Sequence, residues 1–472
     1  MRWIGLGVLV AAGLAAGGPA WAAEAGGAVD GRLLGLVWVA PFAGILLSIA
    51  LCPLLTPSVW HHHYGRIGAF WALAFLVPFA LLHGGATAWY ETMHMMVLDY
   101  VPFMALILAL YTTAGGVMLT GTLRGNPATN TIMLAIGTVI ASLTGTTGAS
   151  MLLVRPVLRA NAGRTRQAHT FVFFIFLVAN IGGSLTPLGD PPLFLGFLRG
   201  VSFFWPTLHL LAPMVITAGV LLAIYFVLDS WHWRNEPEPL RRAPPVSDPP
   251  GVEGGINVLL LVAVVATVLM IGLWRPGQFD ILGQKLGIQT GIAVLLFIAI
   301  AALSLVLTPG TLRIANGFTW EPMKEVAKLF AAIFITIIPA LAILRAGNDG
   351  ALGWLIQLTS RADGSPNPAT YFWLTGGLSS FLDNAPTYLI FFNLAGGDPV
   401  HLMTDRAQIL LAISAGAVFM GANSYIGNAP NFLVKAIAEE KGVPMPSFFG
   451  YCAWAVMFLI PIFLLLTLLF FR

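Results

Sequence analysis

Several segments of the chain are each long and apolar enough to cross a lipid bilayer as a helix. A bilayer core needs roughly 20 mostly apolar residues to span it. The expected spans cover residues 33–52, 67–83, 97–119, 207–229, 256–274, 288–307, 324–345 and 447–471. Only 9% of the residues are charged, against about 25% in a soluble domain. We therefore predict an all-α membrane protein, because one soluble core could not bury so much apolar surface.

The first 22 residues have the composition of a secretory signal. Arg2 precedes the apolar run 4–16, which is too short to span, and residues 20–22 form an A-x-A-like cleavage site. We predict that residues 1–22 are removed, so that the mature N-terminus lies in the periplasm and the protein in a bacterial inner membrane. The alternative is a short anchor that is not cleaved. The loops that this orientation places inside are the richer in Lys and Arg, as the positive-inside rule requires.

Four further apolar segments are interrupted by polar, Gly-rich or Pro-rich residues. Two of them are long enough for two half-helices each, and we interpret them as re-entrant hairpins at residues 130–160 and 369–395. The other two are single spans with an unwound middle, at residues 169–200 and 407–438. Unwound backbone at membrane depth is tolerated only where protein or a water-filled cavity receives it. The four breaks therefore predict a shared polar cavity.

The only polar linker, residues 230–255, lies near the midpoint and is expected in the cytoplasm. It separates two halves, residues 23–229 and 256–472, and each half is expected to hold five spans and one hairpin. Because five is odd, the second half must enter the membrane upside down. Inverted repeats of this kind are typical of secondary transporters.

The repeat is also visible in individual residues of the breaks. Gly189 aligns with Gly427 and Asp190 with Asn428, a shift of 238 positions that yields the shared pattern G-[DN]-x-P-x-F-L. The hairpins align at a shift of 239, which places Thr144 opposite Asp383. Two nearly equal shifts support a duplication.

Two acids lie in the breaks, Asp190 and Asp383. An acid at the centre of a membrane helix costs about 2.5–3.5 kcal/mol on insertion scales. One interpretation is that each acid caps the half-helix that follows it, as Asp before Pro often does. The other is that each binds a cation or a proton. We favour the second, because Ser or Asn would cap equally well without a charge.

Hydroxyl and amide oxygens around the breaks suit a hard cation such as sodium. A single Ser or Thr in a helix usually bonds to its own backbone, so only the clustering at four breaks supports a ligand role. The predicted cation- or proton-binding residues are Asp190, Asp383, Thr144, Thr146, Thr147, Ser184, Thr186, Asn384, Thr387, Asn423, Ser424 and Asn428. No cofactor is expected besides a coupling sodium ion or proton. The run His61–His63 is expected in a short inner loop without a metal role, and no motif indicates an enzyme.

These motifs resemble the ion-transporter superfamily, which includes NhaD-type sodium/proton antiporters, arsenite exporters and citrate or dicarboxylate carriers. Residues 184–190 are similar to the acid-bearing break of the antiporters. Residues 421–429 are similar to the late motif of the arsenite and citrate carriers, and residues 382–387 resemble the D-N-x-P/T hairpin tip common to the group.

The resemblance implies that each hairpin tip faces the broken helix of its own half. Asp190 would then lie with residues 144–147, and Asp383 with Asn423 and Asn428, so that each half-site holds one acid. The resemblance also implies a homodimer in which the unbroken early spans of each half form a static scaffold.

Three functions are compatible with the sequence. In cation/proton antiport, one buried carboxylate binds either Na⁺ or H⁺, and competition couples the two ions. In ion-coupled uptake of citrate or another small carboxylate, a cation must bind beside the acids before the anion does. A channel or sensor would need neither the paired breaks nor the acids. No Arg or Lys lies in the breaks to bind an anion, and we therefore expect sodium/proton antiport.

Overall fold

The computed structural model describes residues 29–121, 123–238 and 251–472. The predicted signal segment 1–22 and the middle of the linker lie outside these residues. Eight described helices are long and apolar enough to cross a membrane, or nine if a pair bent by 40° counts as one span. The prediction of an all-α membrane protein is therefore confirmed.

The helices of span length in the first half are Leu36–Leu55 (η3, Leu36–Val39, and α2, Ala40–Leu55), α3 (Pro57–His83), Gly85–Ala114 (α4, Gly85–Met95; η4, Met96–Tyr100; α5, Val101–Ala114), α10 (Trp205–Arg234) and α6 (Pro127–Thr144), the last of which is the first arm of the hairpin. Those of the second half are α12 (Gly255–Leu273), α13 (Ile288–Leu307), α23 (Phe448–Phe470) and the bent pair α15 (Glu321–Thr336) and α16 (Ile338–Arg345). Short helices in the connections are η2 (Gly31–Leu33), α14 (Gly310–Ala315), η6 (Gly347–Asp349), α17 (Gly353–Leu358) and α20 (Pro399–Met403).

Two antiparallel ribbons connect the ends of spans. Strand β1 (Met118–Thr120) pairs with β2 (Gly251–Glu253), with Leu119 opposite Val252. Strand β3 (Gln278–Ile281) pairs with β4 (Gln284–Gly287). The first ribbon joins the end of α5 to the start of α12, so that the two halves of the chain are fastened together there.

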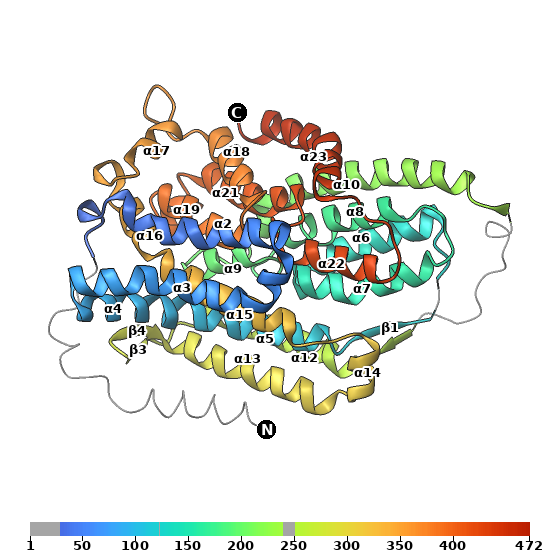
Figure 1. The fold of residues 1–472 in the computed structure, drawn as a ribbon, viewed down its shortest axis with the longest axis horizontal. Helices are drawn as coiled ribbons and strands as arrows, with labels where there is room; N and C mark the ends of the chain where they lie inside the picture. The colour runs from blue at the N-terminus through green and yellow to red at the C-terminus, as the bar shows by residue number, and fades with distance from the viewer. Residues whose placement is uncertain (1–28, 122, 239–250) are drawn as a thin grey trace.

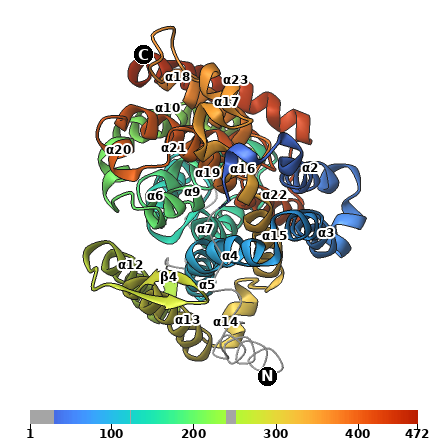
Figure 2. The ribbon, with the colours of Figure 1, turned by 90° about the vertical axis from the view of Figure 1, so that its left-hand side faces the viewer.

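The elements around the four breaks occupy the middle of the molecule. The first half supplies α7 (Thr146–Ala160), α8 (Ala168–Leu177), η5 (Ile181–Ser184) and α9 (Pro191–Leu198), and the second supplies α18 (Pro368–Ser379), α19 (Asn384–Leu394), α21 (Ala407–Met420), η7 (Gly421–Asn423) and α22 (Ala429–Glu440). Most helices run roughly along the long axis (Figure 1), and α2–α3 and α12–α13 lie on different sides of this central group (Figure 2).

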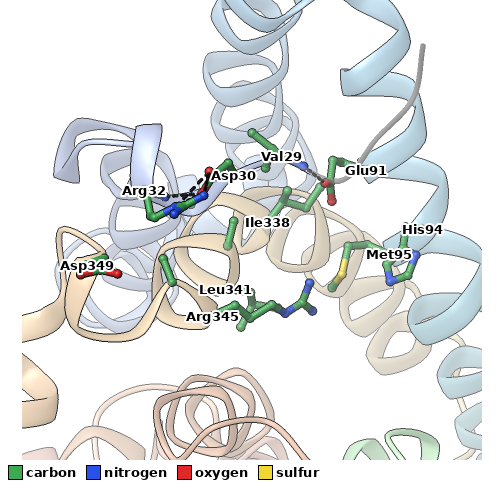
Figure 3. Close-up of a pocket in the computed structure, with 13 residues that line it drawn as sticks. Val29, Asp30, Arg32, Glu91, His94, Met95, Ile338, Leu341, Arg345 and Asp349 are labelled. Atoms are coloured by element: carbon green, nitrogen blue, oxygen red, sulfur yellow. Dashed lines mark hydrogen bonds and ion pairs between the residues drawn. The ribbon is translucent and has the colours of Figure 1, made fainter.

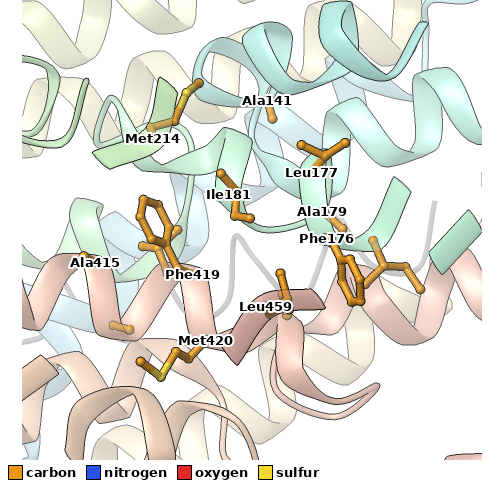
Figure 4. Packing of buried hydrophobic residues seen from close by; sticks show 14 of the residues in the cluster. Ala141, Phe176, Leu177, Ala179, Ile181, Met214, Ala415, Phe419, Met420 and Leu459 are labelled. Carbon is orange, nitrogen blue, oxygen red and sulfur yellow. The ribbon is translucent and has the colours of Figure 1, made fainter. Parts of the chain in front are cut away.

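Helices α8 and α21 are apolar on all sides because they are buried on all sides. Every residue from Phe171 to Val178 is fully buried, and Ile181 and Phe419 belong to the same apolar cluster (Figure 4). The cluster surrounds both breaks, so their unwound backbone is enclosed by protein rather than by lipid.

The contacts between hairpin and broken helix recur 238 positions apart. Ser142 Oγ donates to Gly182 O at 2.5 Å, and Ser380 Oγ donates to Met420 O at 3.2 Å. Thr186 donates to the carbonyl of Ser142, as Ser424 does to that of Ser380. These pairs extend the correspondence between the halves from sequence to contacts.

The hairpin tips also correspond at a shift of 238. Gly145 and Asp383 are the N-caps of α7 and α19. The predicted pairing of Thr144 with Asp383 is therefore wrong by one residue. Gly145 has a φ of +79°, which only glycine adopts readily, whereas Asp383 turns the chain at a φ of −53°. The two tips differ in residue type at the aligned position, which is why the sequence misplaced the register.

The three histidines at 61–63 lie inside α3, and not in a loop as predicted. Pro57 is the first residue of this helix, where its fixed φ and missing N–H favour a helix start. The helix therefore begins ten positions before the apolar pattern that predicted it. No cluster of three or more potential metal ligands occurs among the residues that the structure describes.

A buried ion cluster fixes the base of the first hairpin to α10. The Asp229 carboxylate lies 2.6 Å from the Arg164 guanidinium and 2.8 Å from His169 Nε2. Asn130 Nδ2 donates to the same carboxylate at 3.1 Å. Because all four side chains are buried, the cluster joins the start of α6, the loop after α7, the start of α8 and the end of α10.

Candidate functional site

Asp190 lies at the break between η5 and α9, with extended backbone at φ −147° and ψ 143°. It is the N-cap residue of α9, but its side chain makes no capping hydrogen bond. The next two residues are Pro191 and Pro192, which have no N–H to donate. The Asp190 carboxylate is therefore directed away from its own helix.

Three neutral side chains donate hydrogen bonds to this carboxylate. Thr146 Oγ1 lies 3.0 Å and Asn428 Nδ2 3.3 Å from Oδ1, and Asn384 Nδ2 donates to Oδ2. Thr146 begins α7, Asn384 begins α19, and Asn428 is the N-cap of α22. Asp190 is 1% exposed. One buried carboxylate thus joins all four breaks.

This arrangement corrects the expectation of two separate half-sites. The contact of Asp190 with Thr146 agrees with the implied pairing, but Asn384 and Asn428 come from the other half of the chain. Asp383 accepts from the Ala385 backbone N–H at 3.0 Å and thereby caps α19. The two acids therefore differ: Asp383 caps its helix, and Asp190 does not. The second half contributes two neutral donors, Asn384 from its hairpin and Asn428 from its broken helix, so Asp190 is the shared acceptor.

Asn180 connects the two broken helices and was missed by the sequence analysis. Its Nδ2 donates to Asn431 Oδ1 at 2.7 Å, and Asn428 Nδ2 donates to its Oδ1 at 3.2 Å. Because Asn428 also donates to Asp190, Asn180 orients a ligand of the carboxylate. Position 418, which is 238 residues later, is Val, so the repeat gave no indication of Asn180. Its signal in the sequence was an amide directly after the apolar run 171–179.

The other predicted residues mainly hold the tips in place. Ser184 Oγ donates to Ile181 O at 2.8 Å, and Asn423 Nδ2 donates to Ser380 Oγ at 2.9 Å. Thr144 and Thr387 donate to backbone carbonyls of their own hairpins. Thr186 and Ser424 make the tip contacts described above, and Thr147 lines the cavity next to Asp190.

A cavity of about 120 Å³ adjoins the Asp190 carboxylate. The breaks form its polar end, with residues 144–148, residues 187–191, Asp383 and Asn428. Helices α5 and α15 form the opposite wall, where the side chains are apolar or aromatic. The lining, all of it within the described part of the chain, includes no Lys, Arg or His.

Two buried amide oxygens at the breaks have no hydrogen-bond partner among the residues that the structure describes. They are Asn384 Oδ1 and Asn423 Oδ1. A buried polar atom left unpaired costs free energy. Asn384 already donates to Asp190 through its Nδ2, so its unpaired oxygen lies beside the carboxylate, where an oxygen ligand for a cation would be useful.

A second cavity, of about 400 Å³, lies along α16 (Figure 3). Its charged lining residues include Glu91, which accepts from Val29 N at 2.7 Å, and Arg345. The Arg32 guanidinium there lowers the pKa of Asp30 by donating hydrogen bonds to it. An apolar seam runs along α15 between the two cavities. It is formed by Phe330, Phe334, Ile337 and Leu389.

Comparison with known proteins gives one family and two curated relatives. Residues 31–471 match the model of a family described as "Putative citrate transport". One relative is an uncharacterized transporter of Mycobacterium bovis, and the other an uncharacterized transporter of Mycobacterium tuberculosis. Each is 27% identical over 347 residues, which cover 68% of this chain and 72% of the relative.

Proposed function

The chain belongs to the family described as "Putative citrate transport", and from that premise we propose that it is a secondary transporter that exchanges sodium for protons at Asp190. The family and the spans make it an integral membrane transporter. The exchange of sodium for protons by alternating access, with Asp190 as the shared binding group, is the finer proposal.

The observation that carries the proposal is the environment of Asp190. Its carboxylate is buried at the meeting point of four helix breaks, and its three hydrogen-bond partners are all neutral. None of the described residues that line its cavity carries a compensating positive charge. A buried carboxylate without a counter-ion is stabilised by a bound cation or by protonation. Because one group cannot hold both ions at once, competition between them couples their movements.

Two of the helix N-termini at the cavity are poor sites for an anion. A helix N-terminus binds anions through its first free N–H groups. Helix α9 begins with two prolines, and the second residue of α22 is Pro430, so these ends lack part of that donor set. An ionised tricarboxylate would meet Asp190 and Asp383 without any basic side chain in the lining.

Sodium- or proton-coupled transport of citrate or a dicarboxylate is the alternative, and the family description favours it. In that case cations would have to occupy the site first, so that the substrate anion meets a neutral or positive surface. The two proposals therefore differ in whether sodium moves protons without citrate.

Purified protein in proteoliposomes with a trapped pH-sensitive dye separates the two proposals. Under antiport, external sodium should raise the pH of an acidic interior at the same rate with and without citrate. Sodium-driven uptake of labelled citrate, without any sodium-driven proton movement in its absence, would replace antiport by the alternative. If no ion or anion gradient drives any flux, both proposals fail.

The assembly and orientation remain part of the proposal. We expect a homodimer in the inner membrane, with the mature N-terminus in the periplasm and the linker in the cytoplasm. Native mass spectrometry across several mild detergents would contradict the dimer if it found monomers alone.

A further inference from the structure

The wall opposite Asp190 is apolar in a way that an inorganic cation does not require. Helix α5 contributes Phe103, Leu106, Ile107 and Leu110, and α15 contributes Met323, Val326 and Phe330. An alkali-metal ion needs several oxygen ligands around it. The oxygens of this cavity are confined to its polar end, so a bare ion would leave most of the remaining wall without a partner.

The cavity is also larger than one ion requires. A site needs about 10–15 Å³ of such volume to hold a single water molecule, and this cavity has about 120 Å³. It therefore has room for a group of several non-hydrogen atoms beside the carboxylate. An apolar wall does not bind water well, so the group that fits this space best is a cation with apolar substituents.

Aromatic rings make up part of the same wall. Phe103 and Phe330 stack with their ring centroids 5.0 Å apart, and Phe194 lies 6.4 Å from Phe103. Tyr111 also lines the cavity, and its hydroxyl proton is already engaged, because it donates to Thr319 O at 2.6 Å. Aromatic rings attract ammonium groups, and quaternary ammonium ligands are bound by such walls.

We propose that this cavity binds a small quaternary ammonium cation, with its charge beside the Asp190 carboxylate and its methyl groups against the wall formed by α5 and α15. The inference rests on the proposed exchange at Asp190 and extends it to organic cations. It requires two features together: a carboxylate without a basic partner, and an aromatic and aliphatic wall facing it. The second cavity, along α16, lacks this combination, because acidic and basic side chains are interspersed there.

The test uses tetramethylammonium as the probe and tert-butanol, which is nearly isosteric and uncharged, as its control. A quaternary ammonium is required, because an ordinary amine crosses the bilayer as the free base and dissipates the pH gradient without any protein. Two readouts are recorded on the full-length protein: movement of protons in proteoliposomes, and the ligand-induced rise in unfolding temperature in detergent, which reports binding alone.

The expected result is that tetramethylammonium stabilises the protein and releases protons from acidic vesicles, whereas tert-butanol does neither. Asp190→Asn should abolish both effects. Phe330→Leu should weaken the response to tetramethylammonium about three- to thirtyfold, the range of one cation–aromatic contact, and should lower the ratio of this response to the sodium response. Phe334→Leu is the matched control, because Phe334 lies one turn further along α15 and lines the seam rather than the cavity.

Each outcome decides between the inference and the function on which it rests. A sodium response without any effect of tetramethylammonium would refute the organic-cation site and leave sodium/proton exchange standing. Asp190-dependent stabilisation by tetramethylammonium without proton movement by either cation would refute the exchange and retain the binding site. Equal effects of tert-butanol and tetramethylammonium, or an unchanged response in Phe330→Leu, would show that the wall does not recognise a cation.

Discussion

Replacement of Asp190 by Asn removes one negative charge at almost constant shape. In the variant, Oδ1 of residue 190 still accepts from Thr146 and Asn428. The new amide nitrogen, however, takes the place of Oδ2, which accepts from Asn384 Nδ2 in the wild type. Two donors would then face each other. Asn384 Oδ1 has no hydrogen-bond partner. Rotation of the Asn384 side-chain amide by half a turn therefore restores the third hydrogen bond, with Asn384 Oδ1 as the acceptor and the new amide nitrogen as the donor.

The expected change in folding stability is small. Hydrogen bonds to a charged group contribute about 1.5–3 kcal/mol and neutral ones about 0.5–1.5 kcal/mol, so three converted bonds lose roughly 3–4.5 kcal/mol. The cost of an acid at membrane depth, about 2.5–3.5 kcal/mol, is removed at the same time. The two changes nearly cancel, and we expect the unfolding temperature and the amount of folded protein to remain close to those of the wild type.

The effect on ion binding is large by comparison. Two unit charges 4 Å apart interact by about 4 kcal/mol at an effective dielectric constant of 20, and every 1.4 kcal/mol changes affinity tenfold. Sodium affinity should therefore fall several hundredfold in Asp190→Asn. The assay is the initial rate of sodium-driven proton release from vesicles across sodium concentrations, with the folded protein quantified in each preparation. A half-saturating sodium concentration within threefold of the wild type would refute the assignment of Asp190.

Three further predictions concern residues around this site and the ion cluster below it. Asp383→Asn should keep sodium-driven flux within about threefold of the wild type, because Asn caps a helix about as well as Asp; a loss equal to that of Asp190→Asn would make Asp383 a second ligand. Asn180→Val copies the residue at the equivalent position of the other half. It should leave buried amides unpaired, which lowers the free energy of unfolding by about 1–3 kcal/mol, and it should raise the half-saturating sodium concentration. Thermal unfolding measures the first effect and flux titration the second. Asp229→Asn should destabilise the protein by about 3–5 kcal/mol, because it leaves the buried Arg164 without its main partner. Unchanged thermal unfolding in detergent would show that the cluster does not hold the hairpin.

The positions of the breaks followed from composition, but the contacts between them did not. Gly and Pro in otherwise apolar segments interrupt helices for local reasons, so the interruptions before Asp190 and Asn428 were visible in the sequence. The contact of Asp190 with Asn384 joins residues 194 positions apart. Nothing local specifies such a contact, and an internal repeat indicates which residues are equivalent rather than which ones touch.

The different roles of the two acids could not be assigned from the sequence alone. Asp190 and Asp383 each precede a half-helix, and the same capping rule applies to both. The deciding difference is the residues that follow them. Pro192 lacks the N–H at the second helical position, which a capping side chain could use, whereas Ala385 supplies the N–H at that position to Asp383. The relevant signal was present in the sequence, but its meaning depended on the donors that other helices bring to Asp190.

A single exchangeable carboxylate limits how much work the transporter can perform. If Asp190 carries one sodium ion in one direction and one proton in the other, each cycle transfers no net charge. The membrane potential, which is worth about 2.3 kcal/mol per charge at 100 mV, then contributes nothing to the driving force. At equilibrium the sodium ratio across the membrane equals the proton ratio, and each pH unit sustains only a tenfold sodium gradient, about 1.4 kcal/mol. Sodium expulsion by such a protein would cease wherever the two sides of the membrane have the same pH, whatever the voltage.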